Sequence, residues 1–454
     1  MVKETNRYAT QQSNPSYYRK CRKWVDLDVS DVQKFIGLRI FMGYHYLPSF
    51  HDYWRDDPID GGVTLPSLVM SRDKFFRIKA HLHFSDNMHP DAKTDRYWKI
   101  RPVINILDER FRTVYTPTQK VCIDESLFLY RGRHHAVQFI KTKRSRYGLK
   151  VFKLCESDGP ITGYTSAFSV YLGGEGKKPT KKDQLISYTT VVQLLERAKL
   201  LDKNYILFTD NWYSSPTLFH DLQARKTAAI GTVSINRKHM PSLDVKKPGD
   251  VDYCTSPLGM LAMSWMDRRR VNLLTTIHKE PDMKDVKCQK PGEWTKKPQI
   301  VLDYNLGKTG VDVSDQMASY YQTRRKSVKW YQTLFWHLVD TAVVNAFLVW
   351  KILGGQDRVN AKQLQFRKDL IRVWFGMDSP NFISPLKRPF ASRNCLLELI
   401  PDGKWRKCRW CTRHWKARKD TKYWCRQCEY PLCAGHCFNM FHAEQESSDP
   451  DDQL

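Results

Sequence analysis

The middle of the chain has an order of elements that few folds can accommodate. Three segments with the alternating apolar pattern of β-strands come first, at residues 121–130, 149–155 and 161–172. An amphipathic helix is predicted over residues 187–201, and a fourth strand follows at residues 205–209. Because crossovers between parallel strands are right-handed, the fourth strand can lie beside the first and parallel to it. The two strands would then end at the same edge of one sheet.

Aspartates end both of these strands and open a later helix. Asp124 comes directly after the apolar run 121–123, and Asp210 follows the fourth strand. Asp312 and Asp315 lie three residues apart at the start of a predicted helix, so they share one of its faces. Acids on the first and fourth strands, with a third on a later helix, are typical of an α/β, RNase H-like catalytic core. Mg²⁺ prefers oxygen ligands, so these acids predict a site for Mg²⁺, or for Mn²⁺ in its place.

Each of these residues also has a plainer explanation when it is considered alone. An Asp-Asn pair after a strand often forms a turn or caps a helix, and Asp312 could cap the helix that it opens. Their order and placement together favour a metal site. Glu125 follows Asp124 on a strand, so we expect its side chain to point to the opposite face and to be structural. Trp212 is expected in the core rather than as a platform for stacking bases.

The charge of the chain indicates which partner it binds. Of its 454 residues, 74 are Lys or Arg and 48 are Asp or Glu, which gives a formal net charge of +26. Such a surplus attracts polyanions, so we expect the carboxylate metal site to act on nucleic-acid phosphates. The polar first twenty residues do not resemble a signal peptide. The apolar stretch 334–353 contains charged and polar residues, so we expect no membrane span and an intracellular protein.

Changes in composition and pattern divide the sequence into eight regions. A turn-rich insertion separates the second and third acids, and its expected strands are residues 258–265 and 271–277. A proline-containing linker precedes a cysteine-rich module. The predicted regions are 1–118, helical, for DNA binding and dimerisation; 119–238, the first part of the core; 239–297, the insertion domain; 298–323, the core helix with the third acid; 324–378, a second helical region for DNA binding and dimerisation; 379–403, the linker; 404–442, the zinc module; and 443–454, a disordered acidic tail.

Six of the twelve cysteines lie close together, between Cys408 and Cys437. In a reducing compartment, two Cys-x₂-Cys pairs followed by further cysteine and histidine predict zinc rather than disulfides. The number of ligands indicates two tetrahedral zinc ions, in an interleaved arrangement like that of PHD and RING modules. Cys395 is one of six cysteines that lie singly in the sequence. The predicted ligands are Cys408, Cys411, Cys425, Cys428, Cys433, Cys437 and His442, with either His436 or His414 as the eighth.

Several basic clusters are candidates for contact with DNA. One follows the first predicted strand, and another leads into the long apolar helix near residue 330. Any one of these clusters could equally be an ordinary solvated face. The basic residues around the cysteine cluster also suit a DNA backbone. The candidate DNA-binding residues are Lys141, Lys143, Arg144, Arg146, Arg324, Arg325, Lys326 and Trp330.

Several segments, taken in order, resemble those of piggyBac-type transposases and of the proteins derived from them. The similarity extends over nearly the whole chain and ends in the cysteine cluster. Because many motifs occur in the right order, the match is more specific than any single motif. The segments that carry it are Glu4–Ala9, Ile123–Ser126, Arg131–Arg133, Lys150–Cys155, Thr209–Ser215, Gly310–Met317 and Pro431–Cys433.

The resemblance implies a DDE-type recombinase that excises a DNA element at TTAA ends through hairpin intermediates and reinserts it at TTAA. It implies that Asp124, Asp210 and Asp312 bind the catalytic Mg²⁺, with Asp315 as an auxiliary acid. It also implies that the partners are double-stranded DNA, with its terminal repeats, and a second copy of the chain. The expected location is the nucleus.

Two other functions fit parts of the sequence. The chain starts at the Glu4–Ala9 segment, where family members carry further N-terminal residues, so a domesticated, non-catalytic DNA-binding protein is the main alternative. The zinc module alone would also suit a chromatin-peptide reader or a ubiquitin ligase. The intact aspartates favour the enzyme, and the large acid-bearing core argues against the reader or ligase.

Overall fold

The computed structural model describes most of the chain as two compact units, Met1–Phe375 and Gly376–Leu454. Each unit is described here by itself. Four of the candidate DNA-binding residues, Lys141, Lys143, Arg144 and Arg146, lie outside the described residues, as does most of the predicted linker. The structure describes residues 1–11, 24–55, 59, 63–139, 147–173, 183–287, 294–377, 395–415, 418–426 and 428–446.

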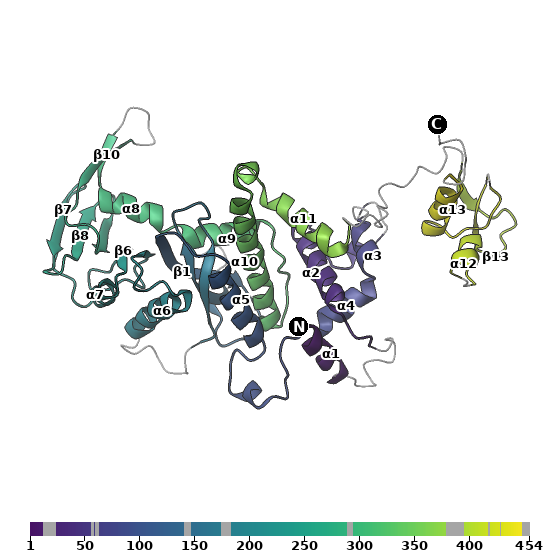
Figure 1. Ribbon diagram of the computed structural model, residues 1–454, viewed down its shortest axis with the longest axis horizontal. Coiled ribbons are helices and arrows are strands. Elements are labelled where there is room, and N and C mark those ends of the chain that lie inside the picture. Colours follow the sequence, from purple (N-terminus) through teal and green to yellow (C-terminus); the bar gives the residue numbers. More distant parts are fainter. Residues whose placement is uncertain are drawn as a thin grey trace. The chain divides into compact units, whose positions relative to one another are not determined.

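A single large sheet forms the centre of the first unit (Figure 1). Its strands run in the order β2-β3-β1-β5-β6-β9-β8-β7, and β4 pairs with β3. β1 is antiparallel to β3 and parallel to β5, and β5 is parallel to β6. β1 and β5, which correspond to the first and fourth predicted strands, are therefore parallel neighbours, as an RNase H-like core requires. These core strands are β1 (Lys120–Leu129), β2 (Gln138–Phe139), β3 (Tyr147–Glu156), β4 (Thr165–Tyr171), β5 (Ile206–Thr209) and β6 (Ala228–Thr232).

Alternation along β1 separates two apolar cores. Val121 and Ile123 face the core formed with α6 (Asp183–Ala198) and α7 (Pro216–Ala224), whereas Cys122 faces the core formed with α8 (Gln299–Gly307) and α9 (Gly310–Tyr320). Successive side chains of a strand point to opposite faces, so one apolar run can serve both layers. The helix that carries the third predicted acid thus packs on the face of β1 that includes residues 122, 124 and 126.

Part of the predicted insertion continues the central sheet. β9 pairs antiparallel with β6 through the register Ile230↔Thr275, and β8 and β7 follow outward. The strands expected at 258–265 and 271–277 are confirmed with slightly shifted bounds. The strands are β7 (Val251–Thr255), β8 (Leu261–Met266) and β9 (Arg270–Thr275), and a separate two-stranded ribbon consists of β10 (Met283–Lys287) and β11 (Trp294–Pro298).

Helices from both sides of the core sequence form the rest of the first unit. Gly37 on α2 lies against the ring of Phe375 on α11, where an added Cβ would come within 2.6 Å of a ring carbon. By length and composition α10 could cross a membrane, but 72% of its most apolar window is buried, as in a core helix. The helices are α1 (Val2–Gln11), α2 (Val29–Tyr44), α3 (Leu65–Val69), α4 (Arg72–His81), α5 (Arg101–Val114), α10 (Trp330–Leu353) and α11 (Gln363–Phe375).

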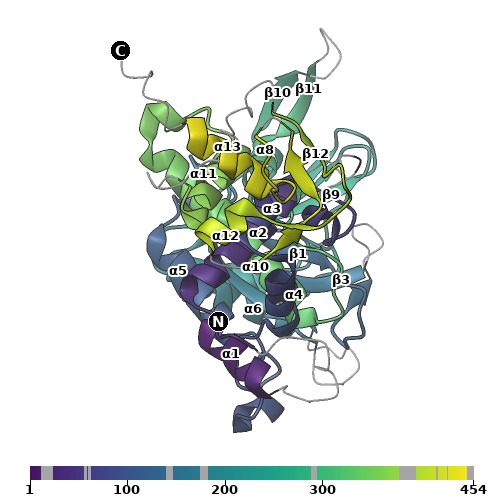
Figure 2. The same ribbon diagram turned by 90° about the vertical axis from the view of Figure 1, so that its right-hand side faces the viewer.

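The second unit, drawn in yellow in Figure 2, is small. It is built around cysteines. Its core consists of cysteine side chains with Trp410, Leu432, Phe438 and Phe441. β12 pairs with β15, so the folded module includes residues from 395 onward. Its elements are β12 (Leu397–Leu399), β13 (Arg406–Lys407), α12 (Arg409–His414), β14 (Asp420–Thr421), β15 (Tyr423–Cys425) and α13 (His436–Glu446).

Candidate active site and metal centres

Two of the predicted acids meet where β1 and β5 end their pairing. The last parallel pair of these strands is Ile123↔Thr209, and Asp124 and Asp210 are the next residue on each strand. The structure therefore brings together two aspartates that are far apart in sequence. Their carboxylate oxygens, and that of Glu125, all lie within 4.8 Å of one another. We call Asp124, Glu125 and Asp210 the acidic group.

The presence of Glu125 in the acidic group corrects the expectation that it is only structural. Its side chain does lie toward the other core, where the hydroxyl of Tyr213 donates to its carboxylate at 3.5 Å. However, β5 ends at Thr209, so on that side of β1 no strand is paired with residues 124 and 125. A carboxylate on either face can therefore reach the same place.

Burial and the neighbouring carboxylates make Asp124 harder to ionise. Burial raises the pKa of Asp124 to about 8, and the neighbouring Glu125 and Asp210 carboxylates add to this shift. Like charges this close cannot all ionise without a counter-charge. A divalent cation supplies that charge, and carboxylate oxygens at this spacing are the donors that Mg²⁺ prefers. The residues present thus fit a hard divalent cation.

The structure places Asp312 and Asp315 differently from the acidic group. Both lie on α9, and Asp312 is exposed in its first turn. Asp312 is not among the described acids that lie within 4.8 Å of one another. One oxygen of Asp315 accepts hydrogen bonds from Ser126 Oγ and from Lys153 Nζ, each at 2.8 Å. Of the four predicted catalytic aspartates, only Asp124 and Asp210 are grouped directly.

α9 lies unusually close to the sheet because it begins with glycine. A Cβ added to Gly310 would lie 2.4 Å from the carbonyl oxygen of Glu156 and 2.8 Å from Cys122 Sγ. Cys122 and Ser126 both lie on the β1 face that α9 covers, with Asp124 between them. Along α9, Gly310 contacts the first of these positions and Asp315 the last. Asp312 lies between these two contact points in sequence, with its side chain exposed.

An open cleft of about 490 Å³ adjoins Asp210. Arg237 Nη2 donates to the carbonyl oxygens of Asn211, at 2.5 Å, and Trp212, at 3.3 Å. The Trp212 ring stacks on Phe152 with centroids 5.5 Å apart, so it packs on the core while it lines the cleft. Sequence analysis missed the cleft because half of its lining follows β6, more than twenty residues after Asp210. The lining residues are Asp210, Asn211, Trp212, Ser234, Asn236 and Arg237.

The basic segment after α9 is mostly engaged inside the protein. Arg324 is largely buried and lies 3.6 Å from Asp340. Arg325 donates to the carbonyl oxygens of Leu47 and Met42 and to the hydroxyl of Tyr53. These guanidinium groups hold the segment to α10 and to the end of α2, and their contact with DNA stays a prediction.

Two other candidates for DNA contact are accessible in this segment. The side chain of Lys326 is exposed, and Trp330 is partly exposed and lies against His134, with ring centroids 5.1 Å apart.

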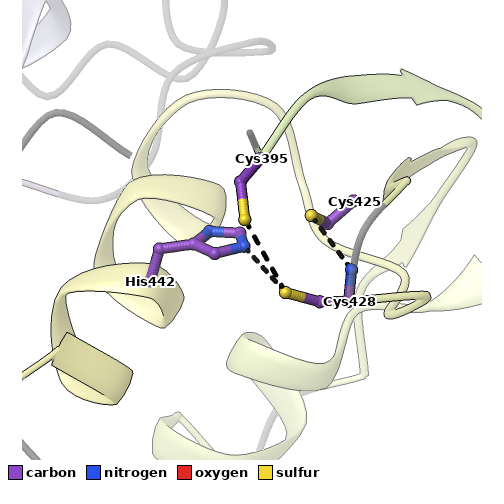
Figure 3. A group of neighbouring side chains, drawn as sticks. All are labelled: Cys395, Cys425, Cys428 and His442. Carbon is purple, nitrogen blue, oxygen red and sulfur yellow. Dashed lines mark hydrogen bonds between the residues drawn. The ribbon is translucent and has the colours of Figure 1, made fainter. Parts of the chain in front are cut away.

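A first group of metal-ligand side chains in the second unit consists of Cys395, Cys425, Cys428 and His442 (Figure 3). The Cys395 and Cys428 sulfur atoms are 3.9 Å apart, and Cys428 Sγ is 3.3 Å from His442 Nε2. A tetrahedral zinc with Zn–S bonds of 2.3 Å places its sulfur ligands about 3.8 Å apart, and a sulfur and a nitrogen about 3.5 Å apart. The spacing of the group therefore fits a tetrahedral ion.

A second group consists of Cys408, Cys411, Cys433 and Cys437. The Sγ atoms of Cys411 and Cys437 are 3.5 Å apart, again near the tetrahedral value. Burial and neighbouring thiols raise the pKa of Cys433 to about 11. A bound cation would offset that cost, because it favours the thiolate.

The two groups alternate along the chain, in the interleaved order that the sequence predicted, but the eighth donor that the structure brings to them is Cys395. Neither histidine proposed for that position belongs to a group. His414 stacks on Trp410, with ring centroids 3.8 Å apart, and His436 stacks on Trp415 at 5.6 Å. Cys395 was missed because it lies thirteen residues before Cys408, next to the proline-containing linker. The pairing of β12 with β15 brings it beside Cys425.

Comparison with known proteins identifies the class to which this fold and site belong. A family model described as "Transposase IS4" matches residues 1–347. The human PiggyBac transposable element-derived protein 3 is 25% identical over 98% of this chain and 74% of its own length. The human PiggyBac transposable element-derived protein 2 is 26% identical over 82% of this chain and 62% of its own length.

A solved structure agrees with this class. The cryo-EM structure of a piggyBac transposase synaptic complex with hairpin DNA matches with a TM-score of 0.70 and 21% identity, covering 96% of this chain and 93% of that one. The likeness to this structure shows the shared fold. The chain belongs to the piggyBac-type transposase family.

Proposed function

We propose that this protein is a DNA transposase that cuts DNA at TTAA sites and joins it there by metal-dependent phosphoryl transfer. The observation that carries the proposal is the meeting of Asp124 and Asp210 at the ends of adjacent parallel strands, with their carboxylates within 4.8 Å. Within a transposase family, such a group of acids supports catalysis rather than binding alone.

The acidic group has the chemistry to hold two Mg²⁺ ions or one. Bound Mg²⁺ would activate the attacking oxygen and stabilise the leaving 3′ oxygen. Asp124 and Asp210 fix their carboxylates on the rigid edge of the sheet, and Glu125 adds a third carboxylate. Asp312 is proposed as the acid that completes the site, because it lies on α9 between Gly310 and Asp315, which contact β1 at Cys122 and Ser126.

We propose zinc for the two groups of the second unit. Each group has four donors, which are thiols except for His442, and this donor set favours zinc over magnesium. Closed four-ligand sites of this kind are structural, so the metals would stabilise the module rather than take part in phosphoryl transfer.

The proposed partners are double-stranded DNA and a second copy of the chain, with the nucleus as the place of action. The net charge of +26 and the exposed Lys326 support binding to the DNA backbone. The matched solved structure is described as a synaptic complex with hairpin DNA, which supports hairpin intermediates for this chain.

The test uses purified protein and a duplex carrying the DNA that flanks the coding sequence, extended through its TTAA ends. We expect nicking and strand transfer in Mg²⁺, and loss of both activities in Asp124→Asn, Asp210→Asn and Asp312→Asn. The matched control is Asp158→Asn, which removes a carboxylate paired with Lys120 on the surface. A wild type that binds the ends but never nicks them, in Mg²⁺ or Mn²⁺, would instead identify a domesticated DNA-binding protein.

A further inference from the structure

Lys153 carries a buried charge beside the acidic group, and the proposed chemistry does not use it. It lies on β3 directly opposite Asp124 in antiparallel register, and only 1% of its side chain is exposed. Paired residues on neighbouring antiparallel strands project to the same face. The ammonium group therefore lies under α9, on the face that also carries Ser126. A charge in that position must be paired to be tolerated.

The partner of Lys153 comes from the helix that carries the third acid. Lys153 Nζ donates to Asp315 Oδ1 at 2.8 Å, and the same oxygen accepts from Ser126 Oγ at 2.8 Å. The Asp315 side chain is 34% exposed, so it reaches in from the edge of the buried region. A single carboxylate thus links β1, β3 and α9. Both hydrogen bonds are accepted by the same oxygen of Asp315, Oδ1.

Close backbone contacts and buried side chains hold α9 against the sheet. A Cβ on Gly163 would lie 3.1 Å from the backbone nitrogen of Ser314, so the turn before β4 also touches α9 closely. Val311 and Ala318 are buried on the inner face of the helix, and Ser314 Oγ lies 3.2 Å from Thr165 Oγ1. The ion pair with Lys153 adds a charged link between α9 and β3. Asp312 is one turn before Asp315 on the same helix, so this link acts close to the third acid.

We infer that Lys153 is a positioning residue for α9, and that Asp315 is its counter-ion rather than a ligand of the catalytic metal. The inference rests on the proposed function, because it concerns how the third acid is presented to the metal. It predicts that Lys153 and Asp315 act as one unit. Loss of either partner should disturb the metal site, and loss of both should disturb it less.

The test is a double-mutant cycle with Lys153→Met, Asp315→Asn and the combined variant. We expect each single variant to raise the Mg²⁺ concentration for half-maximal response about tenfold, as changes beside metal ligands commonly do. The combined variant should return to within about threefold of the wild type, because the buried charge and its partner leave together. The half-maximal Mg²⁺ concentration is measured in two ways, from the Mg²⁺-induced rise in melting temperature and from Mg²⁺-dependent nicking.

Three results would overturn the inference. A combined variant as impaired as Asp315→Asn would make Asp315 a metal ligand. A lower melting temperature with an unchanged Mg²⁺ midpoint would reduce Lys153 to a structural residue. An equal effect from Lys120→Met, which breaks the exposed pair between Lys120 on β1 and Asp158, would make the effect non-specific. If Lys153→Met does not fold, Lys153→Arg keeps the charge and should retain the wild-type midpoint, whereas Asp315→Asn should not.

The two readouts separate this inference from the proposed function. The Mg²⁺-induced melting shift requires metal binding but no cleavage. If the wild type never nicks DNA, the proposed transposase activity fails, while rescue in the melting experiment still supports the ion pair. If the wild type nicks DNA but the combined variant is not rescued, only the role given to Lys153 fails.

Discussion

Replacement of Cys395 by serine tests the metal group that the sequence did not reveal. Cys395 supplies one of four donors, with Cys425, Cys428 and His442. Structural zinc sites contribute about 10–16 kcal/mol to folding of small modules. If the four donors share this equally, Cys395→Ser costs about 2.5–4 kcal/mol, which lowers zinc affinity roughly 70- to 800-fold. The second group keeps all four of its cysteines.

Zinc content after dialysis against a competing chelator measures this effect. We expect two zinc ions per chain in the wild type and one in Cys395→Ser. His436→Ala is the matched control in the same module, because its ring stacks on Trp415 and belongs to neither group. Cys254→Ser removes an exposed thiol from β7 and should also retain two ions.

The opposite pattern would refute the geometric argument. If Cys395→Ser keeps two zinc ions while His436→Ala keeps one, the eighth ligand is the histidine that the sequence spacing suggested. If both variants keep two ions with wild-type resistance to the chelator, Cys395 and His436 are both dispensable, and the tetrahedral spacing at Cys428 has another cause.

Four further predictions concern charged groups of the first unit and the binding of DNA. The pKa of Asp124 is raised to about 8, so only about one tenth of its carboxyl groups are ionised at pH 7 without metal. Titration should therefore show Mg²⁺ binding roughly tenfold weaker at pH 7 than well above pH 8. In the folded protein Asp124 ionises only near pH 8, whereas in the unfolded chain it ionises near pH 4, so the free energy of unfolding falls as the pH rises between these values. Asp124→Asn should therefore stabilise the metal-free protein at pH 9 and not at pH 4, as measured by urea unfolding. Arg325→Ala should lower the free energy of unfolding by about 3 kcal/mol, because two carbonyl oxygens and the Tyr53 hydroxyl lose a charged donor. Lys326 is exposed, so Lys326→Ala should leave urea unfolding unchanged and weaken DNA binding. If about six phosphates are contacted, log K for non-cognate DNA should fall with log[salt] at a slope near −5, and a slope near zero in filter-binding assays would contradict the DNA-binding surface.

Local patterns in the sequence were sufficient to predict the central strands and two of the acids. The alternation of Val121 to Ile123 and the short apolar run before Asp210 are properties of neighbouring residues, and the rule for parallel crossovers then places the strands together. The two Cys-x₂-Cys pairs are equally local, because their spacing alone brings both sulfur atoms to one ion. These predictions required no knowledge of distant contacts.

Contacts between distant residues decided the rest, and the sequence carries little sign of them. Glu125 joins the acidic group next to the point where β5 stops, and Arg325 turns inward to the carbonyl groups of Met42 and Leu47, at the end of α2 and just after it.

Strand pairing and side-chain pairing decided two further features. The pairing of β12 with β15 brings Cys395 beside Cys425, which is thirty residues later in the chain. The carboxylate of Asp315 accepts a hydrogen bond from Lys153 on β3. Spacing along the chain determines which donors can share an ion when they are close in sequence. When the donors are far apart in sequence, packing determines which of them share an ion. A buried polar group is stable only with a partner, and the fold decides which partner lies beside it.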